Sequence, residues 1–197
     1  MKVDGGISTD LNKVPANARE VEAAGYSGAW TAETAHDPFL PLPLAAEHTT
    51  TLELGTSIAV AFARNPMLLA NIGWDLQAYS KGRFILGLGV SGPQVIEGWY
   101  GQPSNKPLAR TREYVEIIRR VIRREEPLDF QGEFYQHPYH GEGAVGLGKP
   151  LRIIIHPQRP DVPIFIGSEG PKNVRQTAEF ADGWLPLYYS PYRQEVY

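Results

Sequence analysis

The chain has 197 residues, 42% of them hydrophobic and 21% charged, and its 19 basic and 22 acidic residues give a formal net charge of −3. Such a composition is ordinary for one soluble globular domain and offers no polycationic face to nucleic acid. Without cysteine, disulfides and thiolate metal sites are excluded. The N-terminus has no apolar signal core and no apolar run approaches a membrane span of ~20 residues, so we expect a cytoplasmic protein without a membrane partner.

Short apolar runs alternate with helical patterns from the N-terminus onward, as in βαβ units that build a parallel sheet. Asn65 followed by Pro66 predicts the start of a helix, and Gly25 predicts the end of one. In chain order, the expected elements are strand 3–7, helix 15–24, strand 28–32, helix 44–48, strand 52–61, helix 66–79, strand 84–88 and helix 108–124.

The alternation stops between Pro127 and Pro163, in a stretch rich in Gly, Pro, His and aromatic residues. So long an irregular connection predicts an insertion, with strand-like pieces at 129–135 and 152–155. The rhythm then resumes with strand 164–166, helix 171–181 and strand 183–188.

Six strands in this rhythm fit either a doubly wound open sheet or a (β/α)8 barrel. A barrel takes about 250 residues, so this chain is short by roughly two units. We therefore expect one domain over residues 1–197, an α/β barrel truncated after about six βα units. Its first and last strands should then present unpaired edges, because six strands cannot close as eight do.

The glycines Gly87, Gly89 and Gly92 form a G-x-G-x-x-G run at the end of a predicted strand. A dinucleotide-binding fingerprint would open a helix directly, but Pro93 follows and the next clear helix is expected some 15 residues later. The alternative is a strand end whose glycines let the backbone approach a flat ligand. We favour this alternative.

A second small-residue turn, Gly167-Ser168-Glu169-Gly170, leads from a predicted strand into a helix that begins at Pro171. Free backbone N–H groups and the positive end of the helix dipole suit a phosphate at such a turn. An ordinary βα turn explains the same residues, and the pattern alone leaves both readings open.

The loop after the second strand contains Glu33 and His36, a carboxylate and an imidazole that could pair for proton transfer. Loops at the carboxyl ends of barrel strands carry the chemistry of such folds. A purely structural pair is the alternative. His137 and His140 lie in irregular sequence without a third ligand at metal spacing, so we expect no metal site.

Long co-linear segments resemble one protein family. They are GLGVSGPQVIEGWYGQP (87–103), KPLARTREYVEIIRR (106–120), GKPL (148–151), PIFIGSEGPKNVRQTAEFADGWLPLYYSP (163–191), EAAGYSGAWTAETAHDPF (22–39) and LELGTSIAVAFARNP (52–66). These segments cover nearly the whole chain in order. The chain thus resembles the coenzyme F420-dependent oxidoreductases of the luciferase-like monooxygenase superfamily.

The resemblance implies a (β/α)8 barrel that binds deazaflavin or flavin at the carboxyl ends of its strands. It implies a cis peptide at Ser57-Ile58 behind the ring and places Val90, Ser91 and Gly92 along the ring and ribityl chain. The phosphate falls on Gly167, Ser168, Glu169, Gly170 and Pro171, with the Glu169 side chain turned away. A homodimer is expected on the same basis.

The expected activity is hydride transfer between F420 and a small organic substrate, with His36 exchanging a proton and Glu33 orienting it or contacting the ring. Many relatives have Asp-His adjacent after strand two, where this chain has Glu33 and Thr34. Some carry a glutamate where Pro93 and Gln94 stand here. An FMN-dependent monooxygenase and a non-catalytic flavin-binding barrel fragment are the alternatives.

Overall fold

The computed structural model describes residues 1–154, 156 and 161–196 as an α/β fold. Its parallel sheet contains β1 (Asp4–Gly6), β2 (Gly28–Thr31), β3 (Glu53–Thr56), β4 (Ala59–Val60), β5 (Phe84–Gly89), β8 (Ile164–Gly167) and β9 (Gly183–Leu185). The helices are α1 (Val14–Ala23), α2 (Pro41–Glu47), α3 (Pro66–Tyr79), α4 (Pro93–Gly98), α5 (Pro107–Arg123) and α6 (Pro171–Phe180). Two short 3-10 turns lie at Ala61–Ala63 and Gln194–Val196.

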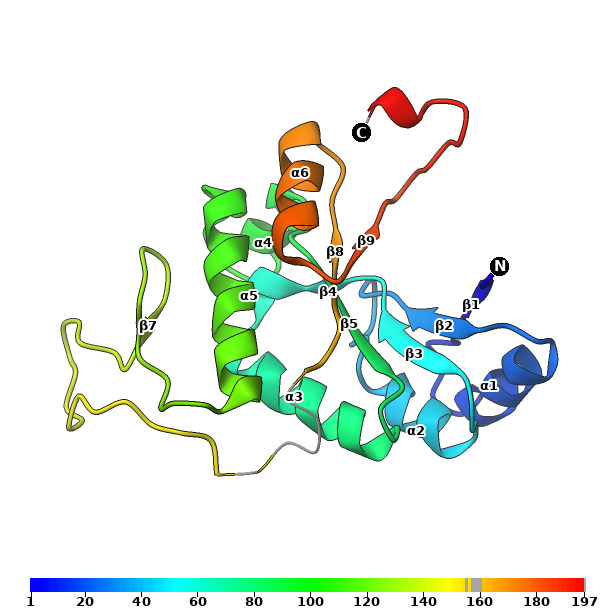
Figure 1. Ribbon diagram of the computed structural model, residues 1–197, viewed down its shortest axis with the longest axis horizontal. Helices are drawn as coiled ribbons and strands as arrows, with labels where there is room; N and C mark the ends of the chain where they lie inside the picture. Colours follow the sequence, from blue (N-terminus) through cyan, green and yellow to red (C-terminus); the bar gives the residue numbers. More distant parts are fainter. Residues whose placement is uncertain (155, 157–160, 197) are drawn as a thin grey trace.

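The strand order decides between the two expected sheet types. It runs β1-β2-β3-β5-β8-β9, with β4 pairing β5, and every pair in this sheet is parallel. A doubly wound sheet reverses its order at a switch point, whereas a barrel adds each strand beside the last. The sheet is therefore an open barrel, curled with its helices outside (Figure 1).

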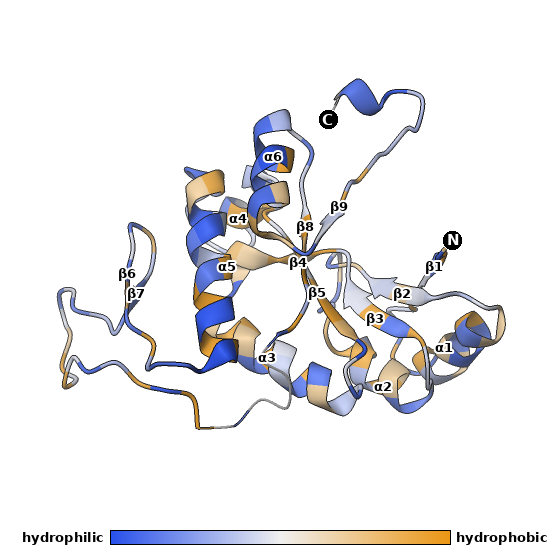
Figure 2. Ribbon diagram, in the orientation of Figure 1, coloured by the Kyte–Doolittle hydropathy of each residue, from blue (hydrophilic) through white to orange (hydrophobic). Residues whose placement is uncertain are grey.

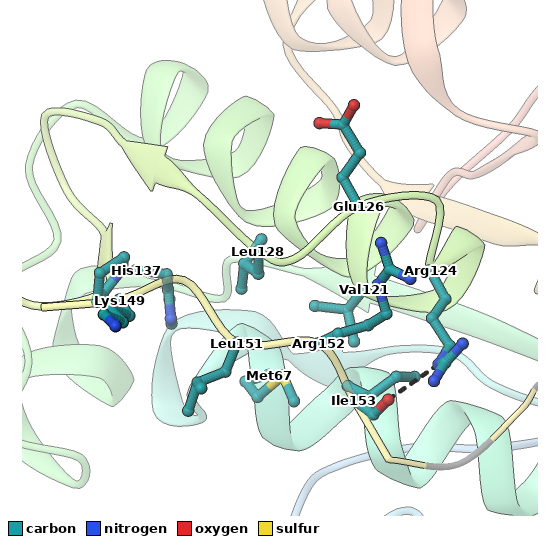
Figure 3. A pocket seen from close by; sticks show the side chains of 11 residues that line it. Met67, Val121, Arg124, Glu126, Leu128, His137, Lys149, Leu151, Arg152 and Ile153 are labelled. Atoms are coloured by element: carbon teal, nitrogen blue, oxygen red, sulfur yellow. Dashed lines mark hydrogen bonds between the residues drawn. The ribbon is translucent and has the colours of Figure 1, made fainter. Parts of the chain in front are cut away.

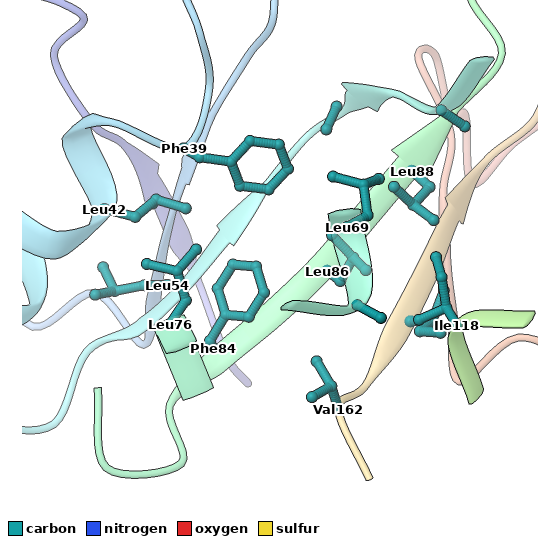
Figure 4. Packing of buried hydrophobic residues seen from close by; sticks show 14 of the residues in the cluster. Phe39, Leu42, Leu54, Leu69, Leu76, Phe84, Leu86, Leu88, Ile118 and Val162 are labelled. Carbon is teal, nitrogen blue, oxygen red and sulfur yellow. The ribbon is translucent and has the colours of Figure 1, made fainter. Parts of the chain in front are cut away.

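The core lies between the sheet and the helices, and Figure 4 shows its centre. Phe84, Leu86 and Leu88 alternate along β5 and are at most 1% exposed. Leu69 of α3 and Ile118 of α5 pack against them. The helix predicted at 108–124 is confirmed as α5, with its apolar residues buried and hydrophilic residues colouring its other face in Figure 2.

The predicted bounds lie within one residue of those of α1, α3, α5 and α6, whereas α2 begins three residues before its predicted start. The helix α3 shows why start signals succeed. Asn65 is its N-cap, and the Asn65 side chain accepts a hydrogen bond from the Met67 N–H at 2.8 Å. Pro66 follows at the first helical position, where its missing N–H is harmless.

The inner face of the sheet carries large aromatic side chains opposite glycines. Trp30 and Phe165 lie with ring centroids 6.0 Å apart. A Cβ at Gly55 would come within 2.4 Å of the Trp30 ring, and one at Gly183 within 2.7 Å of the Phe165 ring. Glycine at these two positions is thus a packing requirement.

Three expectations from the sequence were wrong in detail. The run 52–61 is two strands and not one, and the cis peptide that the resemblance implied is found between them, at Ser57-Ile58. The helix α4 begins at Pro93, where the sequence predicted no helix. Residues 152–154 form no strand, and residue 155 of that expected piece lies outside the described residues.

The segment between α5 and β8 contains an antiparallel hairpin, β6 (Phe130–Gln131) with β7 (Gln136–His137). The Glu113 carboxylate of α5 accepts hydrogen bonds from the N–H groups of Glu133 and Phe134 at 2.8 and 2.9 Å. The Tyr135 ring packs edge-on against Tyr114 with centroids 5.6 Å apart. The hairpin is thereby attached to the amino-terminal half of α5.

Candidate functional site

Three of the segments expected to bind a cofactor meet at the carboxyl ends of adjacent strands. Gly89 of β5 lies opposite Val60 of β4 on one side and Gly167 of β8 on the other. The Ile58 side chain fills the space between them, because a Cβ on Gly89 or Gly167 would lie 2.7 or 2.8 Å from Ile58 atoms. The break between β3 and β4 at Ser57-Ile58, hereafter the bulge, therefore borders the loops that follow β5 and β8 on one surface.

The first two glycines of the G-x-G-x-x-G run pack against this bulge rather than opening space for a ligand. At Gly87 a Cβ would stand 1.7 Å from the Thr56 carbonyl oxygen. The Thr56 hydroxyl donates to the Gly87 carbonyl at 2.6 Å and accepts from its N–H at 3.1 Å. The idea that these glycines admit a flat ligand is corrected accordingly, since protein atoms occupy the space.

Val90, Ser91 and Gly92 leave the strand and turn into α4. Ser91 has a φ of +56°, in the left-handed region that non-glycine residues rarely adopt. The side chain of Ser91 is exposed, and those of its neighbours are half-buried. The loop is thus open to solvent on the surface that borders Ile58.

The turn before α6 exposes backbone donors. Among the described residues, the N–H groups of Gly170 and Lys172 donate to no acceptor, as expected at a helix start. The Glu169 carboxylate accepts a hydrogen bond from the Leu187 N–H. The Ser168 hydroxyl instead pairs with Thr177 at 3.0 Å, inside the protein.

The Glu33 carboxylate lies at the centre of a polar network at the end of β2. It accepts from Arg64 Nη1 at 2.7 Å, from the Val60 N–H at 2.7 Å and from the Tyr100 hydroxyl at 2.5 Å. Arg64 also pairs with Asp37 at 2.9 Å. The Glu33 and Arg64 side chains are only 5% and 14% exposed. Glu33 is therefore bound by these partners and not by His36.

His36 is exposed and has no hydrogen-bond partner among the described residues. It lines an open cleft of about 390 Å³ together with Glu33, Arg64, Trp99 and Tyr100. The structure thus brings His36 and Glu33 into one cleft without joining them. An exposed imidazole here is free to contact a molecule in the cleft.

Tyr100 and Arg64 were missed from the sequence. Burial, together with the Glu33 carboxylate that its hydroxyl faces, raises the pKa of Tyr100 to about 12. Burial lowers the pKa of Arg64, but its hydrogen bonds to Glu33 and Asp37 outweigh this and raise it overall. The only sequence signal was their position in loops after predicted strands.

Metal sites and membrane-spanning helices were also expected to be absent. Within 1–154, 156 and 161–196, no group of three or more His, Asp or Glu side chains could hold a metal ion. In the same residues, no helix has the length and apolar character needed to cross a membrane.

Several known proteins resemble this chain. A "Putative coenzyme F420-dependent oxidoreductase" of Mycobacterium tuberculosis is 51% identical over 177 residues, covering 89% of this chain and 51% of that protein. A 5,10-methylenetetrahydromethanopterin reductase of Archaeoglobus fulgidus is 31% identical over 166 residues, covering 83% of this chain and 46% of the relative. The chain thus spans about half the length of the curated relatives it matches.

Solved structures share the fold. An F420-dependent secondary alcohol dehydrogenase, solved with an F420–acetone adduct, aligns with a TM-score of 0.80 at 18% identity, over 98% of this chain and 60% of that one. The F420-dependent tetrahydromethanopterin reductase of Methanopyrus kandleri gives 0.74 at 24% identity, over 94% and 56%. The profile of the luciferase-like monooxygenase family matches residues 2–195. The chain belongs to the luciferase-like monooxygenase family.

Proposed function

We propose that the protein binds coenzyme F420 across the carboxyl ends of β4, β5 and β8 and transfers a hydride between it and a small organic substrate. The observation that carries this proposal is the meeting of the Ser57-Ile58 bulge, the Val90–Gly92 loop and the start of α6 on one surface. The names of the F420-dependent relatives support the choice of cofactor.

The donor set of the α6 turn fits the phosphate of such a cofactor. The N–H groups of Gly170 and Lys172 point out of a ten-residue helix at its positive end, where an anion is stabilised. The Lys172 side chain adds a positive charge. Gly167 and Pro171 shape the turn, while the hydroxyl of Ser168 faces Thr177 and contributes through its backbone.

The bulge and the glycine loop would carry the ring. Ser57 and Ile58 form its backing, and Val90, Ser91 and Gly92 lie along its edge. When bound, the deazaflavin supplies a hydride donor or acceptor at its C5. The remaining chemistry belongs to side chains of the cleft beside this surface.

His36 is our candidate for the proton that accompanies hydride transfer. Its imidazole takes the proton of a substrate hydroxyl on oxidation, or returns a proton to a carbonyl oxygen on reduction. Glu33 acts by position, since its carboxylate holds Arg64 and Tyr100 at the cleft wall. The substrate in this proposal is a small molecule, and the protein is a cytoplasmic homodimer.

Direct titration tests the cofactor proposal. Oxidised F420, followed by its fluorescence, should bind saturably at one site per chain, and FMN should bind more weakly. Gly170→Asp places a negative charge at the phosphate position and should weaken F420 binding at least about tenfold. Ala178→Asp makes the same charge change on the exposed far end of α6, and should leave the affinity unchanged.

Other results of these titrations would favour a different function or a different binding site. Saturable binding of FMN without F420 would replace this proposal with the FMN-dependent monooxygenase. Equal loss in both variants would remove the α6 turn from the site. Binding of F420 without any hydride transfer to carbonyl or alcohol substrates would favour the non-catalytic alternative.

A further inference from the structure

A second cavity, lined by residues other than those of the cofactor surface, lies between α3, α5 and the segment that returns from the β6–β7 hairpin. Its volume is about 210 Å³. Figure 3 shows its lining, which comprises Met67, Val121, Arg124, Glu126, Leu128, His137, Pro138, Lys149, Leu151, Arg152 and Ile153. Neither the proposed cofactor nor the cleft of Glu33 uses any of these residues.

Hydrogen bonds build the walls of this cavity. The Leu128 N–H donates to the Leu151 carbonyl at 2.9 Å, which aligns the two chain segments. Arg124 Nε donates to the Ile153 carbonyl at 2.9 Å and fastens the same segment to the end of α5. The cavity is therefore held open by defined contacts between α5 and its neighbours.

The centre of the cavity is apolar. Met67, Val121, Leu128 and Ile153 face it from three different elements in Figure 3. Val121 is 4% exposed, whereas Leu151 at the mouth is 79% exposed. An apolar body that filled this space would remove water from these side chains, which stabilises the complex.

The charges around the apolar centre are unbalanced. Arg124, Lys149 and Arg152 carry three positive charges, and the single carboxylate, Glu126, points away from the centre in Figure 3. Two positive charges therefore remain in excess. Carbonyl oxygens are the acceptors that the structure gives for Arg124 and Arg152, and a carbonyl does not neutralise a guanidinium. Burial lowers the pKa of His137, which disfavours a further positive charge at this wall.

We propose that this cavity binds a small carboxylate with an apolar body, about the size of benzoate. An apolar cavity of 150 Å³ in another protein holds benzene, so about 210 Å³ accommodates a ring with a carboxylate attached. The ring lies among Met67, Val121 and Leu128. The carboxylate faces Arg152, which lies beside Val121 in Figure 3 and forms strong charge-assisted hydrogen bonds with such a group. This site is independent of the proposed cofactor binding.

Titration of the ¹⁵N-labelled full chain with benzoate tests the proposal. Benzoate should shift the amide signals of Val121, Leu128 and Ile153 saturably at one site per chain. Benzyl alcohol has the same ring without the charge and should bind about tenfold more weakly. Equal affinity for the two compounds, or no saturable shift with benzoate, would overturn the proposal.

Variants test the cavity and the cations separately. Leu128→Trp fills the apolar centre and should abolish saturable binding, while the Leu128–Leu151 backbone bond persists. Arg152→Gln should weaken benzoate about fivefold and leave benzyl alcohol unchanged. Arg123→Gln removes the same charge from an exposed residue outside the lining and should change neither affinity.

Circular dichroism should show that all three variants are folded. Unchanged benzoate binding in folded Leu128→Trp would contradict the proposed place of the ring. Equal weakening by Arg152→Gln and Arg123→Gln would show that benzoate responds only to overall charge, which also overturns the proposal.

Discussion

Removing the Glu33 carboxylate should destabilise the protein strongly. In Glu33→Ala, the guanidinium of Arg64 keeps Asp37 as its one anionic partner in the described part of the chain, and the N–H of Val60 and the hydroxyl of Tyr100 lose their acceptor. Breaking a buried ion pair by removing one partner costs about 3–5 kcal/mol. Because Asp37 still faces Arg64, we expect the lower end, about 3 kcal/mol.

Urea unfolding at 25 °C measures this change, provided that the slope with urea is unchanged. Glu179→Ala is the matched control, because its partner Arg112 is also a guanidinium but both side chains are about half exposed. That control should cost less than about 1 kcal/mol. Equal losses in the two variants would refute the view that the Glu33 network anchors the end of β2.

Gly87→Ala places a Cβ 1.7 Å from the Thr56 carbonyl oxygen and should abolish the native near-ultraviolet circular dichroism. The control Gly98→Ala places its Cβ in open space and should keep the native spectrum. A native spectrum for Gly87→Ala would contradict the close packing at Gly87. Asn65→Ala removes the α3 cap and should lower the free energy of unfolding in urea by about 1 kcal/mol, and an unchanged value would count against the cap. Folding raises the pKa of Tyr100 from its ordinary value of 10.0 to about 12. The free energy of unfolding should therefore fall as the pH rises from 10 to 12, and it should fall less steeply in Tyr100→Phe. Identical pH profiles for the two proteins would be evidence against the raised pKa.

The fold was largely predictable because local signals agreed with it. The cap at Asn65 and the apolar stripe of α5 each depend on residues a few positions apart, and the sequence shows these directly. The sequence prediction lacks α4 because Pro93 follows the glycines directly, although proline is favourable at the first position of a helix. The strand pattern of 52–61 gave no sign of the break, and only the family resemblance implied the cis peptide at Ser57-Ile58.

The polar network at the end of β2 could not be predicted from spacing. Arg64 is 31 residues from Glu33 and Tyr100 is 67 residues away, and only the parallel order of the strands brings them together. His36 is three residues from Glu33, yet the two are not bonded, because the carboxylate is directed toward Arg64. Sequence proximity indicated the correct loop and the wrong partner.

Chemical-shift mapping with F420 tests the central claim most directly. The ¹⁵N-labelled chain is titrated with oxidised F420, and the amide signals that move are assigned. We predict that Ser91, Gly92, Gly167, Gly170 and Lys172 shift together with one dissociation constant, while Val121 and Leu128 of the second cavity stay unchanged. Shifts that cluster away from the ends of β4, β5 and β8, or that never saturate, would contradict the claim that F420 binds there.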